Sequence, residues 1–97
     1  MTKPTVAVII PAYNASATLP ACLQAIGKMT WTPDEVILFS DGATDDTDDI
    51  ARRAGVSIIR NDGPPKGPAY GRNAAAQAAK SDLLLFVDAV SDEDLAR

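Results

Sequence analysis

The sequence predicts an α/β protein with a parallel sheet of about four strands and three helices on both faces. Two observations support this class. Short apolar blocks alternate along the chain with segments of helical periodicity, and glycine- or proline-rich turns separate them. The apolar blocks also lack alternating polar residues, as expected for strands that are covered on both faces. Such alternation requires right-handed crossovers, which place helices on both sides of the sheet.

The first half of the chain predicts two strands and two helices. Residues 6–10 form a β-branched block that Pro11 closes, which predicts the first strand. Between residues 16 and 29, apolar residues recur at i, i+3, i+4 and i+7, the pattern of one helix. Residues 35–39 predict the second strand, and the helical stripe that follows ends at Gly55.

The second half predicts two more strands and one helix. Residues 56–60 form the third apolar block, and a loop rich in glycine and proline follows. An alanine-rich segment over residues 69–80 predicts the third helix, with Gly67 as its cap and a proline at the first helical position. The fourth strand begins at Leu83 and ends at Val87.

The composition limits both the size and the chemistry of the protein. The 97 residues suffice for one domain, which we expect to occupy residues 1–97. The chain has one cysteine, Cys22, and no histidine. An internal disulfide, a Cys/His zinc site and a Ser-His or Cys-His triad are therefore excluded.

Charge and hydropathy exclude two classes of partner. The net charge is −4, whereas binding to a nucleic-acid backbone requires a basic face, so we expect no nucleic-acid partner. The longest apolar run covers residues 6–12, and a membrane helix needs roughly 20 residues. We therefore expect no membrane span. The first residues lack the pattern of a signal peptide, which favours a cytoplasmic location.

In parallel sheets, ligands bind beyond the carboxyl ends of the strands. The first strand ends without the glycines of a dinucleotide-binding motif or a P-loop. It ends instead in Pro11, Ala12, Tyr13 and Asn14. The ring of Tyr13 offers a surface on which a nucleotide base could stack, and Asn14 offers a donor and an acceptor. The alternative interpretation is a rigid turn with a half-buried tyrosine.

The second strand ends in an acidic turn. Ser40 and Asp41 come first, and the Asp41 carboxylate could accept a hydrogen bond from the imide of a base. Four further aspartates stand at the start of the second helix, where acidic groups favour the helix dipole and cap free amides. We assign that structural role to these four, which are Asp45, Asp46, Asp48 and Asp49.

The remaining strand ends carry opposite charges. Lys66 and Arg72 flank the start of the third helix and, with its N-terminus, form a candidate site for a diphosphate. Solvated helix charges are the alternative. Asp88 follows the fourth strand, where a carboxylate can hold Mg²⁺ or Mn²⁺ against phosphate oxygens, or can simply act as a cap.

Taken in order, these strand ends resemble the family 2 glycosyltransferases of the GT-A fold. The resemblance covers most of the chain but only the nucleotide-binding half of the family's domain. Five segments carry it: residues 8–14, 23–26, 35–47, 66–73 and 84–89.

The resemblance implies a Rossmann-like sheet in the order 3-2-1-4 and a nucleotide-diphospho-sugar as the donor substrate. It also implies that a divalent metal, Mg²⁺ or Mn²⁺, sits on the diphosphate. Carried over residue by residue, Asp88 becomes the first metal-side carboxylate. The implied nucleotide-binding residues are Pro11, Ala12, Tyr13, Asn14, Ser40, Asp41, Lys66 and Arg72.

The sequence departs from the family pattern at two positions. Ser40 stands where the family usually has the first of two acids, which weakens base recognition or shifts it onto Asp41. Val90 stands where the second aspartate of the D-x-D motif belongs, and Asp92 could replace it only if a shortened loop folds back. The acceptor half, which supplies the catalytic base in inverting members, is missing too. We therefore expect a shortened GT-A domain that is inactive alone, with metal binding weak or lost.

Two other functions stay open. The chain could be a non-catalytic binding module or structural fragment that forms a homodimer through the open sheet edge between Leu83 and Val87. Magnesium-dependent phosphoryl transfer through Asp41 and Asp45 is a weaker alternative, because Phe39 stands where that chemistry needs an acid.

Overall fold

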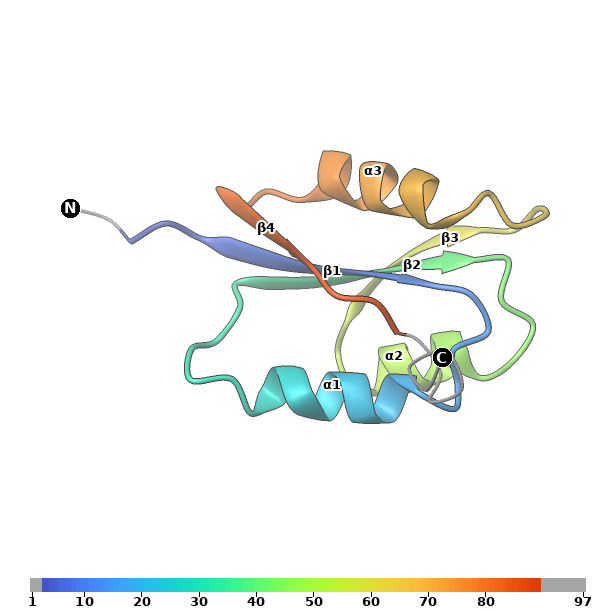
Figure 1. Ribbon diagram of the computed structural model, residues 1–97, viewed down its shortest axis with the longest axis horizontal. Coiled ribbons are helices and arrows are strands. Elements are labelled where there is room, and N and C mark those ends of the chain that lie inside the picture. The colour runs from blue at the N-terminus through green and yellow to red at the C-terminus, as the bar shows by residue number, and fades with distance from the viewer. Residues whose placement is uncertain (1–2, 90–97) are drawn as a thin grey trace, which may run out of the picture.

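The computed structural model describes residues 3–89 and shows a four-stranded parallel sheet between two layers of helices (Figure 1). The strand order is β3-β2-β1-β4, which confirms the predicted α/β class and the order that the resemblance implies. In chain order the elements are β1 (Val6–Ala12), α1 (Leu19–Gly27), β2 (Glu35–Asp41), α2 (Thr47–Arg53), β3 (Ser57–Asn61), α3 (Pro68–Ala78) and β4 (Leu83–Phe86).

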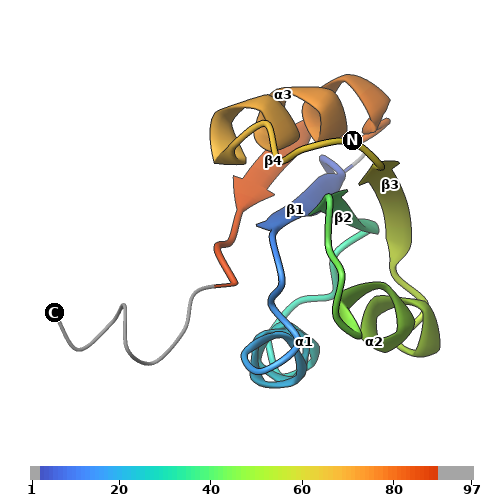
Figure 2. The same cartoon turned by 90° about the vertical axis from the view of Figure 1, so that its right-hand side faces the viewer.

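The two faces of the sheet are covered unequally. Helix α3 lies alone on one face, and α1 and α2 lie together on the other (Figure 2). Successive residues of β1 alternate between these layers. Val8 packs into the core between the sheet and helices α1 and α2, whereas Ile9 packs into the core between the sheet and α3. Both side chains are fully buried, which explains the absence of polar residues from this strand.

Helix α3 lies close to the sheet because small residues face it. A Cβ atom at Gly71 would lie 2.8 Å from Cδ1 of Phe39 on β2, closer than real Cβ atoms approach. The preceding residue, Tyr70, packs edge-on against the same phenyl ring with 5.8 Å between the ring centroids. Glycine at position 71 therefore sets the distance between α3 and β2.

Strand β1 continues through Pro11 to Ala12, two residues beyond the predicted end. The carbonyl of Ile9 accepts a hydrogen bond from Val87 N–H (2.9 Å). Because alternate residues of a strand face the same neighbour, residue 11 also faces the β4 side. Strand β4 pairs with β1 only as far as Phe86 opposite Ile9. Proline has no backbone N–H, and the pairing with β4 does not extend to residue 11, so Pro11 costs the sheet no hydrogen bond.

Strand β4 is the exposed edge of the sheet. Its only neighbour in the described sheet is β1, and its four side chains are 37–52% exposed. The strand ends at Phe86, one residue before the predicted end. Among residues 3–89, no helix has the length and apolar character needed to cross a membrane.

Candidate functional site

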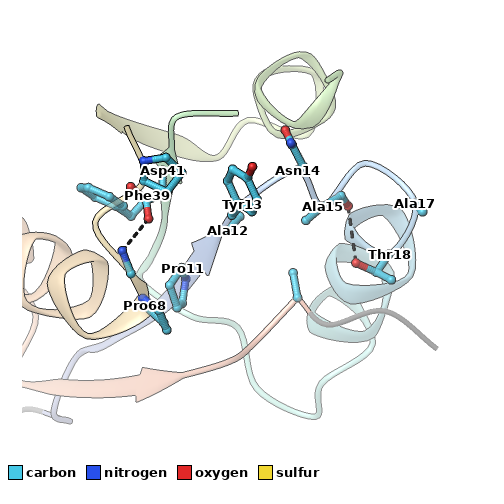
Figure 3. Close-up of a pocket in the computed structure, with 13 residues that line it drawn as sticks. Pro11, Ala12, Tyr13, Asn14, Ala15, Ala17, Thr18, Phe39, Asp41 and Pro68 are labelled. Atoms are coloured by element: carbon cyan, nitrogen blue, oxygen red, sulfur yellow. Dashed lines mark hydrogen bonds between the residues drawn. The ribbon is translucent and has the colours of Figure 1, made fainter. Parts of the chain in front are cut away.

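A hollow of about 500 Å³ opens at the carboxyl ends of β1 and β2 (Figure 3). We call it the strand-end hollow. It lies between the turn after β1, the end of β2 and the start of α3. Its lining consists of Pro11, Ala12, Tyr13, Asn14, Ala15, Ala17, Thr18, Phe39, Asp41, Pro65, Gly67, Pro68 and Ala89.

The structure brings five of the predicted nucleotide-binding residues together in this lining. They are Pro11, Ala12, Tyr13, Asn14 and Asp41. The other three, which are Ser40, Lys66 and Arg72, are not part of the wall. The predicted site therefore divides into a central group around the hollow and a peripheral group beside it.

Asp41 ties the end of β2 to the start of α3. Its carboxylate is 5% exposed. Oδ1 accepts hydrogen bonds from Nδ2 of Asn61 and from the backbone N–H of Lys66, both at 2.9 Å. Oδ2 accepts from the N–H groups of Lys66 (3.0 Å) and Gly67 (2.9 Å). Asp41 thus satisfies backbone donors that directly precede the helix.

The environment of Asp41 keeps its side chain ionised. Burial raises the pKa of this carboxyl, but the hydrogen bonds from Lys66, Asn61 and Gly67, together with the Lys66 charge, outweigh it. The pKa of Asp41 therefore lies below its ordinary value. A negative charge is present at the wall of the hollow at neutral pH.

Tyr13 and Asn14 follow β1 and differ in how free they are. The Tyr13 side chain is 58% exposed and lies in the middle of the hollow's open side (Figure 3). Asn14 has a left-handed backbone with φ of 45°. Its Oδ1 accepts a hydrogen bond from Thr44 N–H (2.8 Å), which ties this turn to the loop after β2. The tyrosine ring is the group available to a ligand.

The two predicted diphosphate residues have different partners near the start of α3. The Nζ of Lys66 lies 4.8 Å from the centre of the Tyr70 ring, a cation–π distance. The guanidinium of Arg72 instead faces Asp88, with 3.8 Å between Nη1 and Oδ1. The structure thus places the predicted anion-binding arginine beside the predicted metal ligand.

Asp88 is suited to supply one ligand to a metal. Its side chain is 61% exposed at the end of β4. Within residues 3–89, no three His, Cys, Asp or Glu side chains gather into a metal-binding group. One carboxylate fits Mg²⁺ or Mn²⁺ when phosphate oxygens and water supply the other ligands. Val90 and Asp92, where the second acid was sought, lie outside the described residues.

Ser40 belongs to a polar network that sequence reasoning did not find. It is fully buried, and its Oγ donates a hydrogen bond to Oδ1 of Asp48 (2.5 Å). Arg60, at the end of β3, donates to Asp48 Oδ2 (2.7 Å) and to Ser40 Oγ (3.3 Å). Arg60 also pairs with Asp62 (2.6 Å). A basic residue at a strand end opposite an acidic turn is the signal that could have indicated this network.

The four aspartates near α2 have several roles. Asp45 precedes the N-cap residue Asp46 and binds a free amide at the helix start, as predicted, because its Oδ1 accepts from the backbone N–H of Thr47 at 3.0 Å. Asp48 lies in the first turn, where acidic groups favour the helix dipole as predicted, and it also accepts from Arg60. Asp49 pairs with Arg52 on the exposed side of the helix at 2.7 Å.

A comparison with family models finds one match over most of the chain. Residues 7–89 match the model described as "Glycosyl transferase family 2".

Two curated relatives illustrate the similarity. A PGL/p-HBAD biosynthesis glycosyltransferase of Mycobacterium bovis is 34% identical over 93 residues, which cover 92% of this chain and 36% of the relative. The validoxylamine A glucosyltransferase of Streptomyces hygroscopicus subsp. limoneus is 33% identical over 91 residues, covering 88% of this chain and 20% of the relative. The chain thus spans about a third or less of the length of these relatives.

Solved structures show the same architecture. Glucosyl-3-phosphoglycerate synthase of Mycobacterium tuberculosis, in complex with Mn²⁺, UDP and glucosyl-3-phosphoglycerate, matches with a TM-score of 0.70 and 29% identity. That match covers 89% of this chain and 33% of the synthase. A mannosyltransferase of Pyrobaculum calidifontis, in complex with GDP-Man and Mn²⁺, matches with a TM-score of 0.77 and 25% identity, covering 91% of this chain and 28% of that enzyme.

Proposed function

Since the chain belongs to glycosyl transferase family 2, we propose that residues 1–97 form the nucleotide-sugar-binding half of a GT-A domain. The donor is a nucleotide-diphospho-sugar, and the reaction it serves is glycosyl transfer. One observation carries this proposal. Five of the residues assigned to the nucleotide by the resemblance line a single hollow at the carboxyl ends of β1 and β2.

In this proposal, the base occupies the strand-end hollow and stacks on Tyr13. The aromatic ring is exposed, and the remaining lining is mostly apolar, which suits the flat face of a base. Asp41 lies against the edge of the base. A carboxylate has about four acceptor sites. Three N–H groups already bond this carboxylate, from Asn61, Lys66 and Gly67, and the Lys66 N–H is shared between both oxygens. A base N–H would therefore take the place of one of the two bonds from Lys66.

The diphosphate lies between the start of α3 and the end of β4. Arg72 supplies a positive charge there, and Lys66 supplies a second one nearby. Asp88 would supply one carboxylate ligand to a divalent metal, with phosphate oxygens and water free to supply the others. When bound, Mg²⁺ or Mn²⁺ stabilises the negative charge of the departing diphosphate. Two of the similar enzymes have solved structures in complex with Mn²⁺ and a nucleotide or nucleotide-sugar, which supports this assignment.

Donor binding without turnover is the activity that we propose for this chain alone. Transfer to an acceptor needs a base positioned against the acceptor hydroxyl. The chain spans 20–36% of the length of these relatives, so we assign the acceptor site to sequence beyond this part of the domain.

Calorimetric titration of UDP and of GDP, each with and without Mn²⁺, tests the proposal. We expect one nucleotide to bind, with Mn²⁺ increasing its affinity in the wild type but not in Asp88→Asn. The result that would overturn donor binding is a folded sample that takes up neither nucleotide at millimolar concentration.

A pair of aromatic substitutions tests where the base lies. Tyr13→Ala should weaken nucleotide binding about 5- to 150-fold, since stacking on an aromatic side chain contributes roughly 1–3 kcal/mol per base. Trp31→Ala is the matched control, because Trp31 is 40% exposed but does not line the hollow. Equal effects of the two substitutions would remove Tyr13 from the site.

The second candidate function is a non-catalytic module that dimerises through β4. The observation in its favour is the exposure of this apolar edge strand, from Leu83 (52%) to Phe86 (46%). Sedimentation equilibrium over a range of concentrations tests it. A dimer that Leu85→Lys converts to a monomer would support this function, and a monomer throughout the range would rule it out.

A further inference from the structure

The turn between β1 and α1 needs support from outside itself. It carries Tyr13 into the strand-end hollow, and the next residue, Asn14, has φ of 45°. Asparagine adopts a left-handed backbone more readily than most residues other than glycine, but the conformation still costs energy that other contacts must offset. The shape of this turn therefore depends on what binds it.

The loop after β2 and the first residue of α2 support three consecutive residues of the turn. Oδ1 of Asn14 accepts from Thr44 N–H (2.8 Å), and Ala15 N–H donates to Oγ of Thr47 (2.9 Å). Ser16 N–H donates to Oδ2 of Asp45 (3.0 Å). Each of these bonds joins residues that are about thirty positions apart in the sequence.

The supporting side chains are also bonded to each other. The Thr47 hydroxyl donates to Oδ1 of Asp45 (2.5 Å) while it accepts from Ala15 N–H. Thr47 is fully buried and Ala15 is 5% exposed, so water cannot replace the bond between them. Burial raises the pKa of Asp45, but hydrogen bonds from Thr47 and Ser16 lower it to about 2, which keeps the carboxylate charged.

We propose that Asp45 and Thr47 are positioning residues for the nucleotide site and together form a clasp that holds the Tyr13 turn ready for a base. The proposal rests on the proposed function. Neither residue lines the hollow, whereas three residues of the turn, Tyr13, Asn14 and Ala15, do. The clasp therefore acts on a ligand only through the shape of the turn.

Two substitutions at position 47 separate the hydroxyl from the shape of the side chain. Thr47→Val keeps the shape and removes Oγ, and Thr47→Ser keeps Oγ. The probe is whichever of UDP and GDP binds more tightly to the wild type, in the presence of Mn²⁺. We expect Thr47→Val to weaken its binding about tenfold, which is the scale of one buried hydrogen bond. We expect Thr47→Ser to stay within about twofold of the wild type. Asp49 pairs with Arg52 on the exposed face of α2, so Asp49→Asn should leave affinity unchanged.

A second measurement works without any nucleotide. Amide hydrogen exchange by NMR should show that Thr47→Val removes protection at Ala15 N–H, that Thr47→Ser restores it, and that Asp45→Asn removes protection at Ser16 N–H. Asp45 is exposed, so Asp45→Asn replaces Thr47→Val if the latter does not fold.

The outcomes distinguish this proposal from the proposed function. Unchanged exchange at Ala15 and Ser16 in folded variants overturns the clasp, and so does wild-type nucleotide affinity in Thr47→Val. A wild-type chain that binds neither nucleotide contradicts the proposed function instead. The exchange measurement still decides in that case whether Asp45 and Thr47 hold the turn.

Discussion

The close approach of α3 to β2 predicts an unusual response to an alanine substitution. In the interior of a helix, Gly→Ala normally stabilises by about 1 kcal/mol, because alanine loses less conformational freedom on folding. At Gly71, the new Cβ would lie 2.8 Å from Cδ1 and 3.2 Å from Cγ of Phe39. Phe39 is 2% exposed, so its ring cannot swing away into solvent. Such overpacking typically costs about 1–3 kcal/mol.

The net change for Gly71→Ala is therefore a destabilisation of up to about 2 kcal/mol, the contact cost less the helix gain. Gly27→Ala is the matched control. Gly27 is the last residue of α1, and nothing lies within 4 Å of a Cβ built there. We expect this control to be neutral or stabilised by up to about 1 kcal/mol.

Thermal and urea unfolding of the two variants provide the assay. Gly27 lies at the end of its helix and gains at most as much from alanine as Gly71, so the difference between the variants is a lower limit for the clash with Phe39. We expect Gly71→Ala to be less stable than Gly27→Ala by up to about 3 kcal/mol, and each kcal/mol corresponds to about 4–8 °C in Tm for a domain of this size. A Gly71→Ala variant as stable as Gly27→Ala would refute the claim that glycine sets this helix–sheet distance.

Three further outcomes are expected in unfolding experiments. Gly42→Ala should be more destabilising than Gly55→Ala. Both glycines have positive φ, but of the two only Gly42 would place a Cβ against backbone, 2.8 Å from the carbonyl oxygen of Gly63. Equal losses of stability in the two variants would contradict this reasoning. Asp41→Asn should lower the free energy of unfolding by about 1–3 kcal/mol at pH 7, because an amide nitrogen would face N–H donors, and urea titration measures the loss. The folded pKa of Asp45, about 2, lies below the unfolded value of about 3.9, so its contribution to stability is complete above that unfolded value and is lost as the pH falls through 2. In Asp45→Asn, the free energy of unfolding should therefore fall less steeply at acidic pH than in the wild type. An equally steep fall would show that Asp45 does not cause it.

The fold was predictable because burial on both faces leaves a direct trace in the sequence. The continuous apolar block of β1 packs against helices on both sides, with Val8 and Ile9 facing opposite layers. The end of that strand was predicted two residues early. Proline usually interrupts a strand, and only the short pairing of β4 shows that the N–H of Pro11 is not needed.

The polar contacts of the candidate site were less predictable. Asp41 was predicted from its place at the end of β2, but its partners are backbone N–H groups of a loop 25 and 26 positions later. No residue type marks such donors in a sequence. The bonds of Ser40 to Asp48 and Arg60 likewise join three elements, and they become visible only when β2, α2 and β3 are placed side by side.

The position of β4 beside β1 has a consequence for the order in which the chain folds. Val6 pairs with Leu83, so the first and last strands of the described chain are neighbours in the sheet. Thr5 and Asp82, which are 77 positions apart, are joined by a hydrogen bond at the start of this pairing. Closing such a long loop costs conformational entropy before the contact contributes any stabilisation, and this cost slows folding. During synthesis on the ribosome, β1 can pair with β2 early, but its other edge waits until β4 has emerged. In that interval this edge of β1 is open to chaperones and to mispairing.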